Sequence, residues 1–96
     1  LRDFNASRRD KLMYARTISF TLLAPSIWPL VEAVAKTSID EPAKRYLMRS
    51  NNNAGVVMEI FASKAEAAQN LGVLKAIQAL NEQAMAKVAI AEGDLL

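Results

Sequence analysis

Apolar residues recur at intervals of three and four positions along the C-terminal half of the chain. The series consists of Val73, Ile77, Leu80, Ala84, Val88 and Ala91. This spacing places its members on one face of a helix, with a period typical of coiled coils and helix bundles. The segment 54–92 contains no proline and is rich in Ala, Glu, Gln, Lys, Leu and Met, which are strong helix formers. We therefore predict a long helix over 54–92, either continuous or kinked near Gly72.

A second line of small residues runs along the same predicted helix. Side chains this small allow another backbone to approach closely. The predicted packing surface comprises Ala65, Ala68, Gly72, Val73, Ala76, Ile77, Ala79, Leu80, Ala84 and Val88. Because apolar residues lie on more than one face of the helix, we expect further copies of the chain or other protein subunits to cover it. The charges of this segment, Glu59 among them, are single and mixed in sign, and we expect them to be solvated.

Helix signals also dominate the N-terminal half. A first helix is expected from about residue 5 or 7 to Ala24, because Pro25 disfavours helical geometry in the residue before it. A second, short helix follows, with Pro29 tolerated in its first turn. A third helix is expected over 39–49, behind a sequence that matches a capping box.

The polar run Ser50–Asn53 separates these elements from the long helix, since asparagines favour turns. Strand signals are nearly absent. The length of 96 residues allows one domain, which divides into 1–35, 36–50 and 54–92. The predicted fold class is therefore all-α, with three or four helices packed as a bundle or in a coiled-coil-like manner.

Residues 17–31 form an uncharged run behind a cluster of basic residues, and a small-x-small sequence follows at 33–35. This is the layout of a secretory signal sequence. As a helix the run would reach roughly 22 Å, short of the ~30 Å hydrocarbon core of a bilayer. Three interpretations stay open: a hydrophobic hairpin buried in protein, a membrane segment, or a retained signal sequence. The candidate contacts with membrane or lipid head groups are Arg8, Arg9, Lys11, Arg16, Phe20, Leu22, Leu23 and Trp28. We expect association with a membrane or the cell envelope, and a cytoplasmic location stays an alternative.

The composition removes many classes of functional site. Histidine and cysteine are both absent, which excludes histidine-based triads, thiol chemistry, disulfides and the metal sites that use these ligands. No phosphate-binding glycine loop occurs, and the net charge of +2 does not argue for nucleic acid. We therefore expect no catalytic residue, no metal, no cofactor, no small-molecule substrate and no enzymatic activity. Because the chain begins with Leu1 rather than Met, we expect it to be a fragment, a processed form or the ordered part of a longer chain.

The segment 63–92, with its run of Ala, Gln, Asn and Leu, resembles the long helices of minor pilus subunits in conjugative type IV secretion systems. This resemblance implies a non-enzymatic assembly component of the cell envelope, which acts through helix packing. It transfers no functional residue to this chain. The alternative is a small soluble helical domain that regulates a partner or binds nucleic acid.

Overall fold

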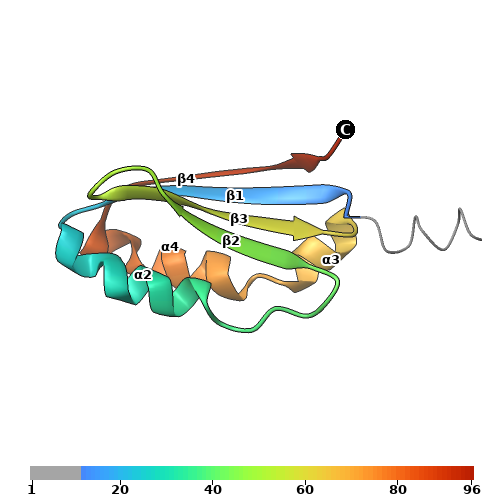
Figure 1. The fold of residues 1–96 in the computed structure, drawn as a ribbon, viewed down its shortest axis with the longest axis horizontal. Coiled ribbons are helices and arrows are strands. Elements are labelled where there is room, and N and C mark those ends of the chain that lie inside the picture. Colours follow the sequence, from blue (N-terminus) through green and yellow to red (C-terminus); the bar gives the residue numbers. More distant parts are fainter. Residues whose placement is uncertain (1–11) are drawn as a thin grey trace, which may run out of the picture.

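The computed structural model describes residues 12–96, and it is built around a four-stranded antiparallel sheet (Figure 1). The strands are β1 (Tyr14–Leu22), β2 (Lys44–Arg49), β3 (Ala54–Phe61) and β4 (Met85–Asp94), and their order across the sheet is β2-β3-β1-β4. The prediction of an all-α fold is therefore wrong, and the chain belongs to the α+β class.

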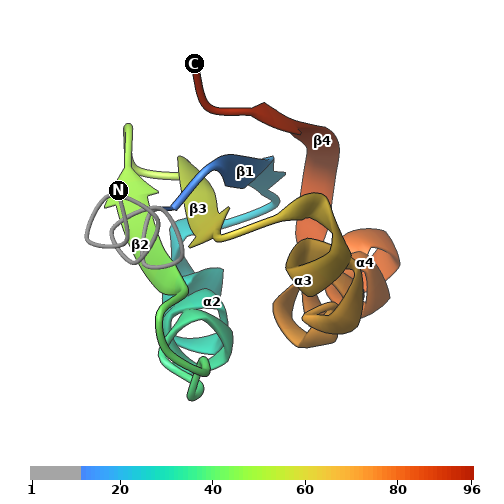
Figure 2. The same ribbon diagram turned by 90° about the vertical axis from the view of Figure 1, so that its right-hand side faces the viewer.

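The helices all lie on one face of this sheet (Figure 1, Figure 2). A short 3-10 turn, η1 (Pro25–Ile27), leads into α2 (Trp28–Ala35), while α3 (Lys64–Gln69) and α4 (Gly72–Ala84) connect β3 to β4. The chain thus runs β-α-β-β-α-β, and each helical connection joins two parallel strands that have a third strand between them. One face of the sheet is covered by helices, and no helix of the described chain lies on the opposite face.

The first strand forms where a helix was predicted, because its side chains alternate in size. Tyr14, Ile18 and Phe20 point to the helical side and are buried, whereas the small or hydroxylated residues between them face the other side. This period of two matches a strand, and β-branched residues such as Thr17 favour it further. This strand ends at Leu22, before Pro25, whereas the predicted short helix with Pro29 in its first turn is present as α2.

The other two helix predictions are wrong in the same way. The segment expected as a helix over 39–49 contains β2, which pairs with β3 from Lys44 opposite Ile60 to Arg49 opposite Gly55. The segment 54–92 contains β3, two separate helices and β4 rather than one long helix. Gly72, where a kink was expected, is the first residue of α4.

Tertiary pairing explains these differences. Residues 55 to 61 alternate between the helical and the open sides of the sheet, and this period of two fits a strand and not a helix. In β4 the helix formers Ala and Glu are held extended by a ladder to the central strand β1, from Tyr14 opposite Asp94 to Thr21 opposite Lys87. Intrinsic helix propensity is a weak preference, and strand pairing overrides it here.

The core lies between the sheet and the helices. Its larger cluster joins Ile18, Leu22 and Val57 of the sheet to Val31 of α2 and Ile77 of α4, all essentially inaccessible to solvent. A smaller cluster around Tyr14, Ala43, Phe61 and Ala67 closes the end near α3. Burial of these side chains positions α2 beneath β2, where the candidate site described below is found.

Gly55 is required by the close packing of the aromatic pair Phe20 and Trp28, whose ring centroids are 5.5 Å apart. A Cβ atom at Gly55 would lie 2.5 Å from the carbonyl oxygen of Met48 and 2.7 Å from Cη2 of Trp28. Because the carbonyl oxygen of Met48 belongs to the backbone of β2, that strand itself would have to move.

We predict that Gly55→Ala lowers the free energy of unfolding by about 2–3 kcal/mol, through overpacking of the core. Urea unfolding followed by circular dichroism measures this loss. Gly93→Ala is the matched control, because a Cβ atom there meets nothing within 4 Å. Equal unfolding midpoints for the two variants would contradict this account of Gly55.

Candidate functional site

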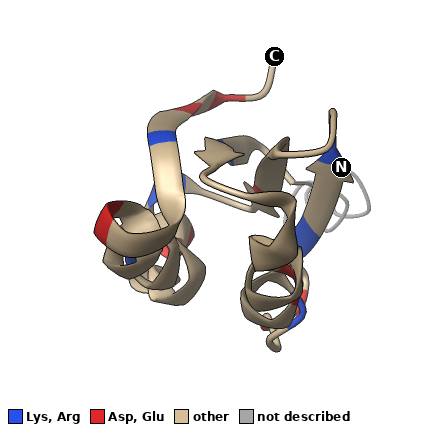
Figure 3. Cartoon of the chain, turned by 90° about the vertical axis from the view of Figure 1, so that its left-hand side faces the viewer, with Lys and Arg blue, Asp and Glu red and all other residues tan. Residues whose placement is uncertain are grey.

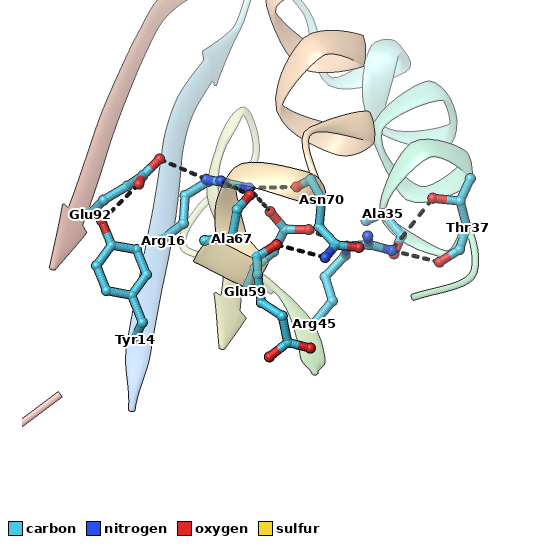
Figure 4. A network of polar contacts seen from close by, with 10 residues as sticks. Tyr14, Arg16, Ala35, Thr37, Arg45, Glu59, Ala67, Asn70 and Glu92 are labelled. Carbon is cyan, nitrogen blue, oxygen red and sulfur yellow. Dashed lines mark hydrogen bonds and ion pairs between the residues drawn. The ribbon is translucent and has the colours of Figure 1, made fainter. Parts of the chain in front are cut away.

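A chain of buried ion pairs crosses the inner face of the sheet (Figure 4). Glu59 of β3 is fully buried, and its carboxylate lies 3.1 Å from Nη1 of Arg16 and 2.9 Å from Nε of Arg45. Arg16 continues the chain to Glu92 of β4 at 2.9 Å. Since two guanidinium groups alternate with two carboxylates, the charges balance, which a low-dielectric interior requires.

Arg16 also binds the end of α3. Its Nη1 donates to the carbonyl oxygen of Asn70 at 2.8 Å, and its Nη2 donates to that of Ala67 at 2.7 Å. These carbonyls lie at the C-terminus of a helix, where a cation is favourable. The guanidinium carbon lies 5.2 Å from the ring centroid of Phe61. Arg16 thereby joins α3 to three strands.

At the β4 end, Tyr14 donates a hydrogen bond of 2.9 Å to Glu92. This bond, together with burial, raises the pKa of the Tyr14 phenol. The hydrogen bond from Arg16 lowers the pKa of Glu92, and the bond from Tyr14 acts in the same direction. Ionised Glu92 therefore stabilises the fold above its unfolded-state pKa, and this contribution is lost as the pH falls through its folded-state pKa.

At the β2 end, Arg45 ties the sheet to α2. Its Nη1 donates to the backbone carbonyl of Thr37 at 2.6 Å and to that of Ala35 at 3.4 Å. These atoms lie at or just beyond the last turn of α2. Arg45 is thus held on one side by Glu59 and on the other by the end of the helix. The ion-pair chain fixes the distance between α2 and β2.

A groove of about 420 Å³ opens between α2 and β2. Its lining includes Trp28, Glu32 and Lys36 from the helix and Arg45, Leu47 and Arg49 from the strand. We call this the α2–β2 groove. Basic residues lie on both elements, as the blue segments of β2 and of α2 indicate in Figure 3.

Trp28 anchors the inner end of the groove. Its indole Nε1 donates to the carbonyl oxygen of Asn52 at 2.7 Å, and its side chain is buried against Phe20. The guanidinium of Arg49 lies over the indole ring, 5.0 Å from its centroid. The groove therefore combines an aromatic floor with cationic groups, a combination suited to a small organic ligand. Residues 12–96 contain no cluster of three acidic side chains that could hold a metal ion.

Neither the ion-pair chain nor the α2–β2 groove was predicted from the sequence, where Arg16 and Trp28 were candidate membrane contacts. Glu59 was expected to be solvated, yet it is the most deeply buried charge of the described chain together with Arg16. The sequence signal was an acidic residue at a position that faces the core in an alternating apolar strand. A buried acid needs a basic partner. Arg45, Leu47 and Arg49 alternate in the same way along β2, so that they share the inner face.

The predicted packing surface is divided among three elements. Val73, Ile77 and Ala84 are buried on α4, and Leu80 packs against the same core. Ala76 is half-buried on α4, and Val88 is half-buried on β4. The remaining members are exposed on α3 and α4: Ala65, Ala68, Gly72 and Ala79. Part of the predicted packing surface is therefore buried in the core of this chain.

The candidate membrane contacts are also distributed differently. Arg16, Phe20, Leu22 and Trp28 are buried in the core, so that they do not face lipid. Leu23 is exposed, and Arg8, Arg9 and Lys11 lie outside the described residues. No helix within residues 12–96 combines the length and hydropathy needed to span a bilayer.

No protein-family model matches the sequence, and no curated protein matches it significantly. Several solved structures share the fold. A dimeric ferredoxin-like protein from an uncultured marine organism has a TM-score of 0.67 at 8% identity, and the match covers 92% of this chain and 91% of that one. A proposed antibiotic biosynthesis monooxygenase from Chloroflexus aurantiacus has a TM-score of 0.65 at 16% identity, covering 88% and 93%. SnoaB, a cofactor-independent oxygenase from Streptomyces nogalater, has a TM-score of 0.59 at 16% identity, covering 90% and 95%.

These identities establish the fold alone, which is ferredoxin-like. They overturn the resemblance to pilus subunits of secretion systems, because the long helix on which it rested does not exist. The expectation of a non-enzymatic helical assembly subunit is corrected for the same reason, and so is the helical regulatory alternative. Two of the structures that share the fold are named as oxygenases.

We predict that Glu59→Gln lowers the free energy of unfolding by about 3–5 kcal/mol, because it leaves two buried guanidinium groups without their shared counter-ion. Glu82→Gln on the exposed face of α4 is the matched control and is expected to change stability by less than about 0.5 kcal/mol. Urea unfolding of both variants measures the difference. A Glu59→Gln protein as stable as the control would contradict the role assigned to the ion-pair chain.

Proposed function

We propose that this chain binds a small organic molecule in the α2–β2 groove and oxidises it with molecular oxygen. The molecule loses two hydrogens and gains one oxygen atom as a carbonyl, and the second oxygen atom leaves as water with those hydrogens. The observation that carries the proposal is the groove itself, whose volume of about 420 Å³ falls within the usual range for small-molecule sites. The oxygenase names of two proteins with the same fold support the reaction class by analogy.

The groove has the rigidity that a binding site needs. Arg45 is fixed by Glu59 and by the last turn of α2, and Trp28 is fixed by its hydrogen bond to Asn52. A site whose walls are held by buried contacts loses little entropy when a ligand enters. The ion-pair chain thus supports the groove without occupying it.

Glu32 is the one carboxylate among the residues that line the groove within the described chain. It lies on α2 beside Lys36, with an N–O distance of 3.7 Å. A carboxylate in this position can accept a proton from an acidic group of a bound ligand. The neighbouring cations would stabilise the anion that results. We assign Glu32 this role as part of the proposal.

We predict that filling the groove from α2 weakens ligand binding. A panel of two-ring phenols, quinols and aromatic acids is screened by quenching of Trp28, which is the single tryptophan of the chain. A compound that quenches Trp28 is expected to be consumed together with oxygen, as an oxygen electrode measures. Glu32→Tyr is expected to weaken binding at least about tenfold by occupying the space.

Glu82→Tyr on the exposed face of α4 is the matched control, and its binding and oxygen uptake should equal those of the unmodified protein. A compound that binds Glu32→Tyr and the control equally well would place the ligand elsewhere. Binding without oxygen uptake for every compound of the panel would contradict the oxygenase part of the proposal alone.

The opposite face of the sheet supports an oligomer. The side chains of Tyr46 and Met48 on this face are both 56% exposed, and that of Met58 is 39% exposed. Around them lie small and hydroxyl residues of β1 and β4, with Lys44 and Lys87 as the only charged groups that the four strands direct to this side. We call this surface the open sheet face.

Exposed apolar side chains gathered on one surface are stabilised when another surface covers them. We propose a second copy of the chain as its occupant, because one structure of the same fold is described as dimeric and an isologous contact needs only a self-complementary face. The small side chains of β1 and β4 allow two sheets to approach closely.

We predict a particle of twice the 10.5 kDa chain mass in sedimentation experiments. Met58→Asp places a charge in the centre of the open sheet face and should shift the particle to a monomer, because burying an unpaired carboxylate is costly. Gln78→Asp on the exposed face of α4 should stay dimeric. A monomeric unmodified protein, or a dimeric Met58→Asp protein, would exclude this interface.

A further inference from the structure

We infer that the ligand of the α2–β2 groove is an organic anion, a carboxylate or phenolate on a flat ring, and that Arg49 recognises its charge. This inference rests on the proposed function, because it names the chemical class of molecule bound at the same site. It comes from the charges that line the groove and from the difference between the two arginines there.

The charges that line the groove favour an anion. Lys36, Arg45 and Arg49 contribute three positive groups, of which Glu59 offsets Arg45 and Glu32 offsets Lys36, so that one positive charge, that of Arg49, is left over. The pair between Lys36 and Glu32 is solvent-exposed on both sides, so that water screens it strongly. A neutral or cationic ligand would leave this excess of positive charge uncompensated.

The guanidinium of Arg45 already binds other groups of this chain. Its side chain is 8% exposed, its Nε donates to Glu59, and its Nη1 donates to the backbone carbonyl of Thr37. The carboxylate of Glu59 offsets its charge. Binding of a ligand anion to Arg45 would break contacts that hold α2 to the sheet. Arg45 therefore positions the wall of the groove and does not recognise the ligand charge.

Arg49 differs in each of these respects. It is exposed, no carboxylate within the described chain pairs with it, and its one hydrogen bond there is a long one of 3.3 Å from Nε to the carbonyl of Asn51. Its two terminal nitrogens donate to no group within residues 12–96. The Trp28 ring beneath the guanidinium holds it in place. A planar fork held over an aromatic ring is suited to bidentate binding of a carboxylate.

The same contact indicates why the ligand carries a ring. Trp28 and Leu47 give the groove an apolar surface next to the guanidinium of Arg49. A small anion without a ring, such as acetate, would leave this apolar surface exposed to water. A flat apolar body with an acidic group at one end satisfies both parts of the site.

The test compares 2-naphthoate with 2-naphthamide, which share ring system and size but differ in charge. Titration calorimetry gives the dissociation constants, and the single indole N–H signal of Trp28 in a nitrogen–proton NMR spectrum reports whether the probe is in the groove. We expect naphthoate to bind at least about tenfold more tightly than naphthamide, as a charge-assisted hydrogen bond implies.

Arg49→Gln should remove this preference, so that the two probes bind within about twofold of each other. Arg49→Lys should retain part of it, since a point charge replaces the fork. Lys75→Gln, which removes one charge from the exposed face of α4, is the matched control and should keep the full preference. Thermal unfolding checks that each variant is folded.

The test separates a failure of the anion inference from a failure of the proposed function. Equal binding of both probes in the groove would overturn the anion inference and leave the proposed function standing. A preference for naphthoate that survives in Arg49→Gln would overturn the role of Arg49. If neither probe shifts the Trp28 signal, the groove does not take ligands of this class, and both proposals are overturned.

Discussion

Burial of Glu59 between two arginines is the constraint on which the rest of the structure depends. A fully buried carboxylate is tolerated only where cations neutralise it, and Arg16 and Arg45 do so from the strands on either side. Each arginine then uses its remaining donors on the end of a helix, Arg16 on α3 and Arg45 on the loop after α2. One acid on the central part of the sheet thereby sets the positions of α2 and α3.

This arrangement gives the two faces of the sheet different properties. The inner face holds the core, the ion-pair chain and, at the β2 edge, the α2–β2 groove with Trp28 and Arg49. The outer face holds exposed apolar side chains such as Met58 and no acidic group from the four strands. The proposed functions follow this division, with a ligand bound on the helical side and a second copy of the chain on the open side.

Part of this could be predicted from the sequence. Pro25 and Pro29 mark the end of the first element and the start of the short helix, and the asparagine run at 51–53 lies at the β2–β3 turn. The strands could not be predicted from propensity, because β4 is built from helix formers and becomes a strand only by pairing with β1. The groove could not be predicted either, since Trp28 and Arg49 meet only after α2 has packed beneath the sheet. The alternation around Glu59 was the available signal, and it was obscured by the alanine-rich composition.

One face of this sheet is proposed to take a ligand, and the other a second copy of the chain. A crystal structure of the protein grown with 2-naphthoate tests both proposals at once. We predict the naphthalene ring in the α2–β2 groove, its carboxylate on the guanidinium of Arg49, and two chains joined through their open sheet faces. Naphthoate bound on the open sheet face, or that face left to solvent while the chains join elsewhere, would contradict it.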